Sequence, residues 1–458
     1  MDGTLTQRIA GSPARQVVAA FTLLITLGTT LLLLPVAVDG SVGLGVEDAL
    51  FMSTSATTVT GLATVDIATF SLFGELVLLA LIQIGGFGIM TVGSVLALVA
   101  SRRVGLRQRM LAQAEIGAID IGELRSLIGA IARITVGVEG TLALVLFFRF
   151  WRGGHEDNAG EALYSAVFHA IATFNNAGIS LYSDNLAAFL GDPIVVGAVT
   201  LGFIIGGLGF PILVEVHRRR AMRAEGHHRA LQLRPWSLHI KITLLATAVL
   251  LVVGPLVVLS FEWTNPGTLG PLPLGDKLLA GWFQGVTPRT AGFNTVDIGA
   301  MNEPTLFIIS ALMFIGAGPA STSGGIKVTT FAVLGYVLWA EIRGERDVHL
   351  FRRRLSPAMI RQAVTIALLS IGVVVGMSLI LMASDGLSLT PALFEAASAF
   401  GTVGLSTGVT GTISTFGHLM LVLVMLAGRV GPVTFATAIA LRTDARTYRY
   451  PEERPIIG

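Results

Sequence analysis

The chain has 458 residues, 53% of them hydrophobic and 13% charged, and its mean hydropathy is +0.75. This composition excludes a soluble globular domain and indicates an integral membrane protein whose first partner is the lipid bilayer. The net charge of +2 gives no indication of a nucleic-acid partner, and the absence of cysteine excludes disulfides and thiolate metal sites.

Eight stretches are apolar over the length of about 20 residues that a helix needs to cross a membrane. In chain order they are roughly 16–36, 74–100, 126–150, 193–216, 238–261, 305–340, 358–383 and 415–441. The first lacks a small-residue cleavage site after it, so we expect a retained span rather than a signal peptide. The sixth is too long for one span and is interrupted by GAGPASTSGG, Gly316 to Gly325.

The basic residues predict the orientation of these spans. Of 31 lysines and arginines, 24 lie in five places: two before the first span, five between Arg102 and Arg125, seven between Arg218 and Lys241, six between Arg343 and Arg361, and four from Arg442 onward. By the positive-inside rule these places are cytoplasmic. We therefore expect a multi-pass protein of the plasma or inner membrane with both termini in the cytoplasm.

Each external connection that joins an odd span to the next even span contains a short apolar piece followed by a turn rich in Gly, Thr and Asn. The pieces read EDALFMSTSATTVTGLAT, EALYSAVFHAIATFNNAGISL, GDKLLAGWFQGVTPRTAGFNT and TPALFEAASAFGTVGLSTG. They align Gly61, Gly178, Gly292 and Gly404, separated by 117, 114 and 112 residues. This spacing indicates a fourfold repeat, with predicted boundaries 1–110, 111–225, 226–350 (with the broken sixth span) and 351–458 (with the C-terminal tail).

The apolar pieces, at about 10 to 14 residues, are too short to cross a membrane, so they are predicted to be re-entrant. Backbone that is not helical at this depth must be buried in protein or face a water-filled cavity. Each repeat crosses the membrane twice, so all repeats share one orientation and their turns meet on a central axis. The predicted fold is an all-α integral membrane protein of four pseudo-symmetric M1-P-M2 repeats, with eight transmembrane helices and four re-entrant pore helices around a central pore.

The four turns have the chemistry of a cation selectivity filter. Rings of backbone carbonyls replace the hydration shell of a monovalent cation. Glycine lets the backbone bend where a Cβ has no room, and the partially negative C-terminal ends of the short helices favour a cation. TPRTAGFNT, Thr287 to Thr295, is then the third quarter of the filter.

The chain resembles the Ktr/Trk/HKT superfamily of potassium transporters, most closely its KtrB branch. Four stretches resemble the pore loops of that superfamily: TTVTGL, FNNAGIS, TPRTAGFNT and GTVGLSTG. The resemblance covers essentially the whole chain and implies potassium uptake. It implies that the potassium ligands are backbone groups of Val59, Thr60, Gly61, Asn176, Ala177, Gly178, Thr290, Ala291, Gly292, Thr402, Val403 and Gly404. Hydroxyl-bearing residues recur irregularly in these loops, so strict selectivity for potassium over sodium stays open.

The interruption of the sixth span predicts a gate. A broken helix at membrane depth lines water or protein, and the family has an intramembrane loop here that obstructs the pore. The candidate gate residues are Gly316, Gly318, Ser321, Ser323, Gly324, Gly325 and Arg429. A packing kink is the alternative, whereas a phosphate-binding loop is excluded because Ile326 follows Gly325 where that motif requires lysine.

Several charged residues lie within apolar stretches. Arg429 is expected deep in the eighth span, as an electrostatic barrier or a latch on the gate loop, with a snorkelling arginine as the alternative. Arg289 either repels cations at the mouth or braces its loop. Arg133 and Glu139 are expected to form inter-helix contacts. His169 and Glu395, on pore helices, are expected to pack or form hydrogen bonds.

The chain has no nucleotide-binding motif or catalytic triad, so we expect a transporter rather than an enzyme, driven by the ion gradient. The resemblance implies potassium as cargo, sodium as a candidate activator, no nucleotide on this chain, and a homodimer docked on a cytoplasmic KtrA-like ring that binds ATP or ADP. The basic connections HRRRAMRAEGHHRALQLR and EIRGERDVHLFRRR are candidate docking surfaces or lipid anchors. The tail YRYPEERPIIG is a candidate dimer contact.

Two other classes of membrane protein share part of this sequence pattern. A secondary transporter of another cation or small solute also has repeats and broken helices, but its repeats are usually inverted, with an odd number of spans each. A membrane scaffold that transports nothing needs neither an intramembrane arginine nor aligned glycines. Channel-like flux and coupling to sodium are not distinguished by the sequence.

Overall fold

The computed structural model describes residues 13–40, 43–101, 121–226, 236–432 and 434, and the helix order is the same in each quarter of the chain. A long helix comes first: α2 (Pro13–Leu32), α6 (Ile121–Arg152), α11 (Leu238–Glu262) and α15 (Pro357–Asp385). A shorter helix follows: α3 (Val46–Thr58), α7 (Ala159–Phe174), α12 (Leu274–Val286) and α16 (Leu389–Gly401). The expected all-α class is confirmed.

The helices that end each quarter differ from one another. They are α4 (Leu72–Ser101), the pair α8 (Pro193–Leu208) and α9 (Phe210–Ala224), the pair α13 (Glu303–Phe314) and α14 (Val328–Ile342), and α17 (Thr415–Val430). Short 3₁₀ turns, η1 (Pro35–Ala37), η2 (Ile67–Thr69), η3 (Ala187–Phe189) and η4 (Thr410–Thr412), lie in the connections. Strands β1 (His349–Leu350) and β2 (Arg353–Arg354) form one antiparallel hairpin.

Four helices in the described part of the chain are long and apolar enough to cross a membrane: Arg15–Leu32, Ile128–Arg152, Leu238–Glu262 and Pro357–Asp385. These are the first helices of the four quarters. The expected fourth span, 193–216, is wrong as a single helix, because α8 and α9 meet at an angle of 99°. The break in the sixth span is confirmed, since α13 ends at Phe314 and α14 begins at Val328.

Tertiary contacts and proline explain the break between α8 and α9. Gly209 has a φ of +93°, and Pro211 is the second residue of the next helix, α9. A Cβ built on Gly209 would lie 2.5 Å from the carbonyl oxygen of Pro319, in the segment between α13 and α14. This close approach requires glycine at position 209. The end of the eighth span differs in the same way: α17 ends at Val430, before Gly431 with a φ of +94°. The expected continuation beyond residue 434 lies outside the described residues.

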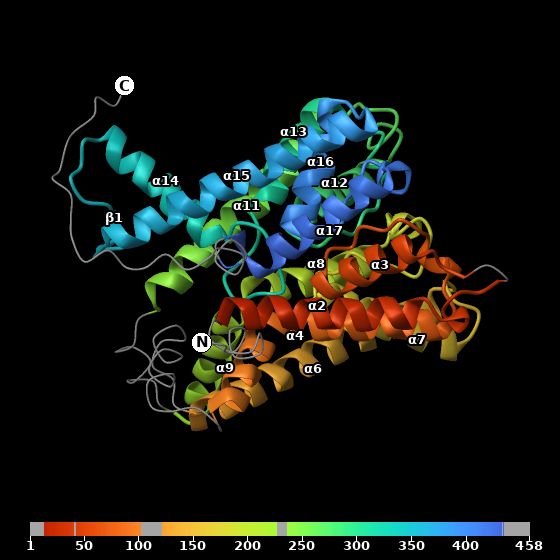
Figure 1. Cartoon of the computed structure of the whole chain (residues 1–458), viewed down its shortest axis with the longest axis horizontal. Helices are drawn as coiled ribbons and strands as arrows, with labels where there is room; N and C mark the ends of the chain where they lie inside the picture. Colours follow the sequence, from red (N-terminus) through yellow and green to blue (C-terminus); the bar gives the residue numbers. More distant parts are fainter. Residues whose placement is uncertain (1–12, 41–42, 102–120, 227–235, 433, 435–458) are drawn as a thin grey trace, which may run out of the picture.

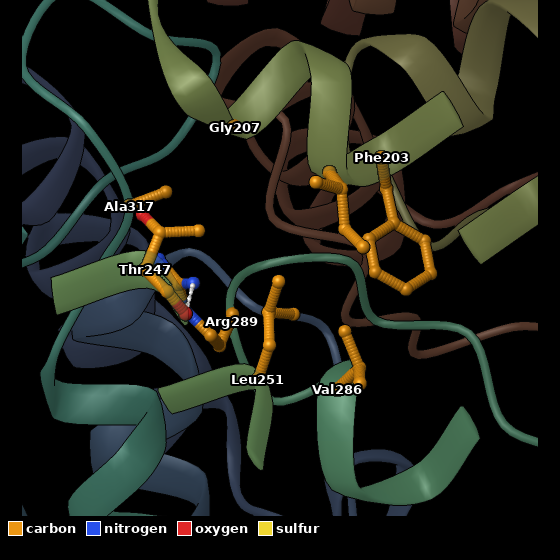
Figure 2. Close-up of a pocket in the computed structure, with 8 residues that line it drawn as sticks. Phe203, Gly207, Thr247, Leu251, Val286, Arg289 and Ala317 are labelled. Carbon is orange, nitrogen blue, oxygen red and sulfur yellow. Dashed lines mark hydrogen bonds between the residues drawn. The ribbon is translucent and has the colours of Figure 1, made fainter. Parts of the chain in front are cut away.

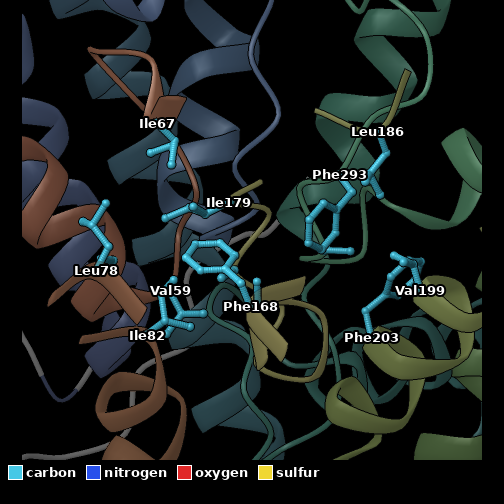
Figure 3. Close-up of a cluster of buried hydrophobic side chains, with 14 of the residues drawn as sticks. Val59, Ile67, Leu78, Ile82, Phe168, Ile179, Leu186, Val199, Phe203 and Phe293 are labelled. Atoms are coloured by element: carbon cyan, nitrogen blue, oxygen red, sulfur yellow. The ribbon is translucent and has the colours of Figure 1, made fainter. Parts of the chain in front are cut away.

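Two large apolar clusters hold the helices together, one built mostly from the first half of the chain and the other mostly from the second half. The red-to-yellow helices of the first half and the green-to-blue helices of the second lie on opposite sides of the molecule (Figure 1). The cluster of the first half reaches the short loops through Val59, Ile179 and Phe293 (Figure 3). Phe394, Phe400 and their neighbours form the cluster of the second half. The loops between the short helices and the following helices are therefore enclosed by packed side chains.

Candidate functional site

The aligned glycines form a closed ring. A Cβ built on Gly61 would lie 2.2 Å from the Ala177 carbonyl oxygen, and one on Gly178 would lie 3.0 Å from the Ala291 carbonyl oxygen. The corresponding distances are 2.1 Å from Gly292 to Val403 and 2.4 Å from Gly404 to Thr60. Each glycine thus faces the residue that precedes the glycine of the next loop, and the fourth loop closes on the first. A side chain at any of these glycines would displace the backbone of the neighbouring loop.

The same backbone conformation recurs in all four loops. The glycines have φ values of +93°, +65°, +74° and +94° in chain order. Two positions before each glycine, Val59, Asn176, Thr290 and Thr402 also have positive φ, between 49° and 71°. This conformation is strained for valine and threonine, because they are β-branched. Such strain persists only where the surrounding structure fixes it, and it is common at functional sites.

The ends of the short helices fix the first and fourth loops in the same way. α3 and α16 end in the left-handed residues Val59 and Thr402. In each loop a serine hydroxyl then accepts a hydrogen bond from the backbone N–H of the ring glycine: Ser55 from Gly61 at 3.0 Å and Ser398 from Gly404 at 3.1 Å. The sequence analysis missed these serines. Their common position, six residues before the glycine, was a signal that could have revealed them.

Side-chain amides connect the second and third loops. The amide of Asn176 lies 3.3 Å from the hydroxyl oxygen of Thr290. Beyond the ring, the Asn185 amide donates to the Gly178 carbonyl oxygen at 3.1 Å, and the Asn294 N–H donates to Oδ1 of Asn185 at 3.3 Å. These hydrogen bonds fix the second and third ring loops relative to each other.

The segment between α13 and α14, which we call the gate loop (315–327), lies against the ring. A Cβ built on Gly324 would lie 2.5 Å from the Thr402 hydroxyl oxygen. The Thr322 hydroxyl lies 3.2 Å from the side-chain amide of Asn176. The gate loop thus contacts the fourth and second ring loops directly. Thr322 was not among the residues expected from the sequence.

The remaining expected gate residues shape this loop or attach it to neighbouring helices. The Gly318 N–H donates to the Gly207 carbonyl at 2.8 Å, and the Gly325 N–H donates to the Gly428 carbonyl at 3.2 Å. Within the loop, the hydroxyl oxygens of Ser321 and Ser323 are 2.7 Å apart. A Cβ built on Gly316 would lie 2.2 Å from the Gly324 carbonyl oxygen, so the loop also packs tightly on itself.

Arg429 connects the gate loop to the first quarter of the chain. Its Nη2 donates to the Gly85 carbonyl at 2.6 Å, and its Nη1 donates to the Thr322 carbonyl. The side chain is 2% exposed. The expectation that Arg429 lies deep within a helix is wrong, because it occupies the last turn of α17. The helix ends there because Gly431 adopts a left-handed conformation.

Lys327, the last residue of the gate loop, is a second cation at this site that the sequence analysis missed. Its ammonium group donates to the Ser323 carbonyl of the same loop. Lys327 is also the residue that precedes α14. Two cationic side chains, Arg429 and Lys327, therefore bind carbonyls of the segment that lies against the ring.

Comparisons with known proteins identify the family of this chain. The family model of TrkH, described as a cation transport protein, matches residues 4–448. The chain belongs to this TrkH family. It is 39% identical over 453 residues to the Ktr system potassium uptake protein B of Bacillus subtilis, covering 98% of this chain and 97% of that protein. The match to the potassium/sodium uptake protein NtpJ of Enterococcus hirae is 30% over 456 residues, covering 98% and 97%.

The fold of the family is also shared with a solved structure. The crystal structure of the potassium transporter TrkH from Vibrio parahaemolyticus has a TM-score of 0.70 with this chain at 21% identity, covering 93% of this chain and 84% of that one. The expected superfamily membership and the expected class of membrane transporter are therefore confirmed. The assignment of individual filter and gate residues stays a prediction.

Other charged residues of this TrkH-family chain have varied surroundings. Glu139 on α6 accepts from Gln83 of α4 and from Asn175 of α7, each at 3.3 Å, so its expected inter-helix contact is confirmed. The same expectation is wrong for Arg133, which is exposed and donates to the Gly129 carbonyl of its own helix at 3.2 Å. Arg289 is buried and donates to the Thr247 carbonyl on α11 at 3.4 Å, so its loop is braced against that helix.

Two buried polar residues of the short helices form hydrogen bonds, as expected. The ring nitrogens of His169 lie 2.7 Å from the Ser165 carbonyl and 3.0 Å from the Ser180 hydroxyl. Glu395 accepts hydrogen bonds from the hydroxyls of Ser406 and Thr410. These contacts attach the loops beyond the ring to the short helices α7 and α16.

Proposed function

We propose that this protein takes up potassium across the cell membrane through the ring of four loops. Two relatives that match almost the whole chain are named a potassium uptake protein and a potassium/sodium uptake protein. Potassium is the cargo in this proposal, and sodium is a second cation that the pathway admits or that activates it. No step of the proposal uses enzymatic chemistry on this chain.

The observation that carries the proposal is the closed ring of glycines. Convergence of the loops brings carbonyl-bearing backbone from all four quarters of the chain to one place, where each glycine packs against the backbone of the next loop. The positive φ values at the ring glycine and two positions before it turn successive peptide groups in a repeated pattern. Carbonyl oxygens arranged in this way replace the hydration shell of a monovalent cation. The proposed ligands are the carbonyls of the twelve filter residues named from the sequence.

We further propose that the gate loop obstructs the pathway and that Arg429 holds it closed. Two features support this role. The gate loop approaches Thr402 and Asn176, which belong to two different ring loops. Arg429 binds a carbonyl of the gate loop and a carbonyl of α4 at the same time. A charge-assisted bond of this kind contributes about 1.5–3 kcal/mol, so its loss would favour a displaced loop.

The assembly belongs to the same proposal. The name of the B. subtilis relative refers to a Ktr system, which fits a partner subunit. We propose a homodimer on a cytoplasmic ring that binds ATP or ADP, in a plasma or inner membrane with both termini cytoplasmic. The connection containing Arg343 and Arg354 supplies one basic docking face. Part of the other basic connection (227–234) and the C-terminal tail lie outside the described residues.

Rubidium uptake into potassium-loaded liposomes that carry the purified protein tests this function. We expect uptake that external potassium suppresses and external sodium suppresses less. Liposomes without protein are the control for leakage. If rubidium does not enter, with or without a cytoplasmic ring subunit supplied, the ring of glycines is architecture and the proposal is wrong.

A further inference from the structure

Arg289 precedes the ring glycine Gly292 by three residues, but its side chain lies in a crevice between α8, α11 and the gate loop (Figure 2). It is 7% exposed. The crevice is lined by Phe203 and Gly207 of α8, Thr247 and Leu251 of α11, and Ala317 of the gate loop. Apart from Thr247, these walls present apolar side chains or glycine, so the guanidinium is a cation in apolar surroundings.

The guanidinium of Arg289 has more N–H donors than there are acceptors around it. A guanidinium carries five N–H donors. The bond to the Thr247 carbonyl, at 3.4 Å, is longer than a normal N–H···O bond. Nε of Arg289 and the hydroxyl oxygen of Thr247 are buried without a hydrogen-bond partner in the described protein. Among the described residues, no carboxylate forms an ion pair with Arg289.

Arg429, the other buried arginine near the ring, has more support from the protein. It donates to two backbone carbonyls, from separate nitrogens, although its Nε also lacks a partner in the described protein. Burying a charge without a partner is costly, so buried charges are paired or strongly hydrogen-bonded. Arg289 has a single long bond to a carbonyl, and its unpartnered Nε and the unpartnered Thr247 hydroxyl belong to residues that line one crevice. An unsatisfied buried group of this kind indicates a water or an ion.

The size of the crevice limits what can bind there. The crevice is small, with room for one water or one small ion. A lipid headgroup, with its many heavy atoms, does not fit in a space of this size. The positive charge of Arg289 favours a small anion over a water.

We propose that this crevice binds one small monatomic anion of the chloride class, held by the Arg289 guanidinium and the Thr247 hydroxyl. The inference goes beyond the proposed transport function and does not depend on it. A bound anion connects the third ring loop to α11 and to the wall that Ala317 contributes. It also neutralises a guanidinium near the ring, which would otherwise oppose a cation there.

Thermal unfolding of the purified full-length protein in lipid nanodiscs tests the anion site. Chloride is titrated against gluconate at constant ionic strength and constant potassium concentration. We expect the Tm to rise with chloride concentration, because a ligand that binds the folded state stabilises it by mass action. Unfolding needs no cation flux, so failure of the transport proposal does not affect the result.

Three variants locate the effect. Arg289→Gln is expected to abolish the dependence of the Tm on chloride. Thr247→Val removes one hydrogen bond while keeping the shape, and is expected to raise the chloride concentration needed for half of the effect by about fivefold. Arg133→Gln, an exposed arginine of α6, is the matched control and should retain the wild-type response.

Two outcomes would overturn the proposal. A wild-type Tm that is independent of chloride means that water satisfies Arg289. A chloride response of full size in Thr247→Val, with the same midpoint as wild type, means that the anion binds elsewhere. This outcome would overturn the proposal even if Arg289→Gln does not fold.

Discussion

Arg429 donates a 2.6 Å hydrogen bond to the Gly85 carbonyl, across a separation of 344 residues. Nη1 of the same guanidinium binds the Thr322 carbonyl of the gate loop. One side chain therefore joins α17, the helix α4 that ends the first quarter of the chain, and the gate loop. Its position makes the gate loop sensitive to a single substitution.

Arg429→Gln is expected to raise basal cation flux. Loss of a charge-assisted bond of about 1.5–3 kcal/mol shifts the equilibrium of the loop toward displacement by roughly tenfold or more. The initial rate of rubidium uptake into proteoliposomes without a ring subunit measures the effect. Arg133→Gln serves as the matched control, because Arg133 is exposed and bonds within its own helix. Unchanged uptake in Arg429→Gln would remove Arg429 from the gate.

The contact between Gly324 and Thr402 predicts a coupled pair of substitutions. An added Cβ at Gly324 would meet the Thr402 hydroxyl oxygen at 2.5 Å and Cγ2 at 2.6 Å. Gly324→Ala is therefore expected to lower the Tm and to raise basal flux, because the gate loop must move. Thr402→Ala removes both clashing atoms, so the effect of Gly324→Ala should shrink in that background.

Gly335→Ala is the control for this double-mutant cycle. Gly335 lies within α14, and nothing lies within 4 Å of its added Cβ. The substitution should be neutral or slightly stabilising, since alanine favours a helix more than glycine does. Strictly additive effects of Gly324→Ala and Thr402→Ala would show that the gate loop does not rest on the fourth ring loop.

Glu139 is predicted to position the second ring loop through Asn175. Both Gln83 and Asn175 donate to its carboxylate, and Asn175 directly precedes the ring residue Asn176. Glu139→Leu removes the acceptor of the Gln83 amide, at a cost of about 1–3 kcal/mol, whereas the Asn175 amide keeps its bonds to Gln83 and to the Ile171 carbonyl. Glu139→Gln retains hydrogen-bonding capacity and should lose less stability. Equal Tm values for the two variants would contradict this role.

The pH dependence of stability is predicted to include Glu47, at the start of α3. Hydrogen bonds from Thr415 and then from His418 lower the pKa of its carboxyl below the ordinary value. A group with a lowered folded pKa stabilises the protein above its unfolded pKa, and this stabilisation disappears as the pH falls through the folded value. The Tm difference between wild type and Glu47→Gln should therefore be largest near neutral pH and shrink below about pH 4. A difference that does not change with pH would contradict the prediction.

The sequence predicted the ring glycines because their requirement is local. A left-handed backbone and a close approach of another chain segment both demand the absence of a Cβ, so glycine recurs at one spacing. The interruption of the sixth span was visible for a similar reason, since its glycines, proline and small polar residues disfavour a continuous helix.

Features that depend on tertiary contacts were not predictable from the chain alone. The break at Gly209 follows from the approach of Pro319, and an apolar pattern from 193 to 216 contains no trace of it. Val59, Thr290 and Thr402 adopt left-handed conformations that their own preferences disfavour. The partners of Arg429 come from distant quarters of the chain. Its apolar surroundings revealed a buried charge but not the carbonyls that bind it.

The selectivity of Gly292→Ser tests the central claim most directly. The Cβ of a side chain at Gly292 would lie 2.1 Å from the carbonyl oxygen of Val403 in the fourth ring loop. Gly275→Ser is the matched control, since nothing lies within 4 Å of an added Cβ there. The measurement is the ratio of potassium to sodium needed to suppress rubidium uptake by half. The account predicts that Gly292→Ser reduces the preference for potassium or abolishes uptake, while Gly275→Ser behaves as wild type. Wild-type uptake and selectivity in a folded Gly292→Ser protein would place the cation pathway outside the ring.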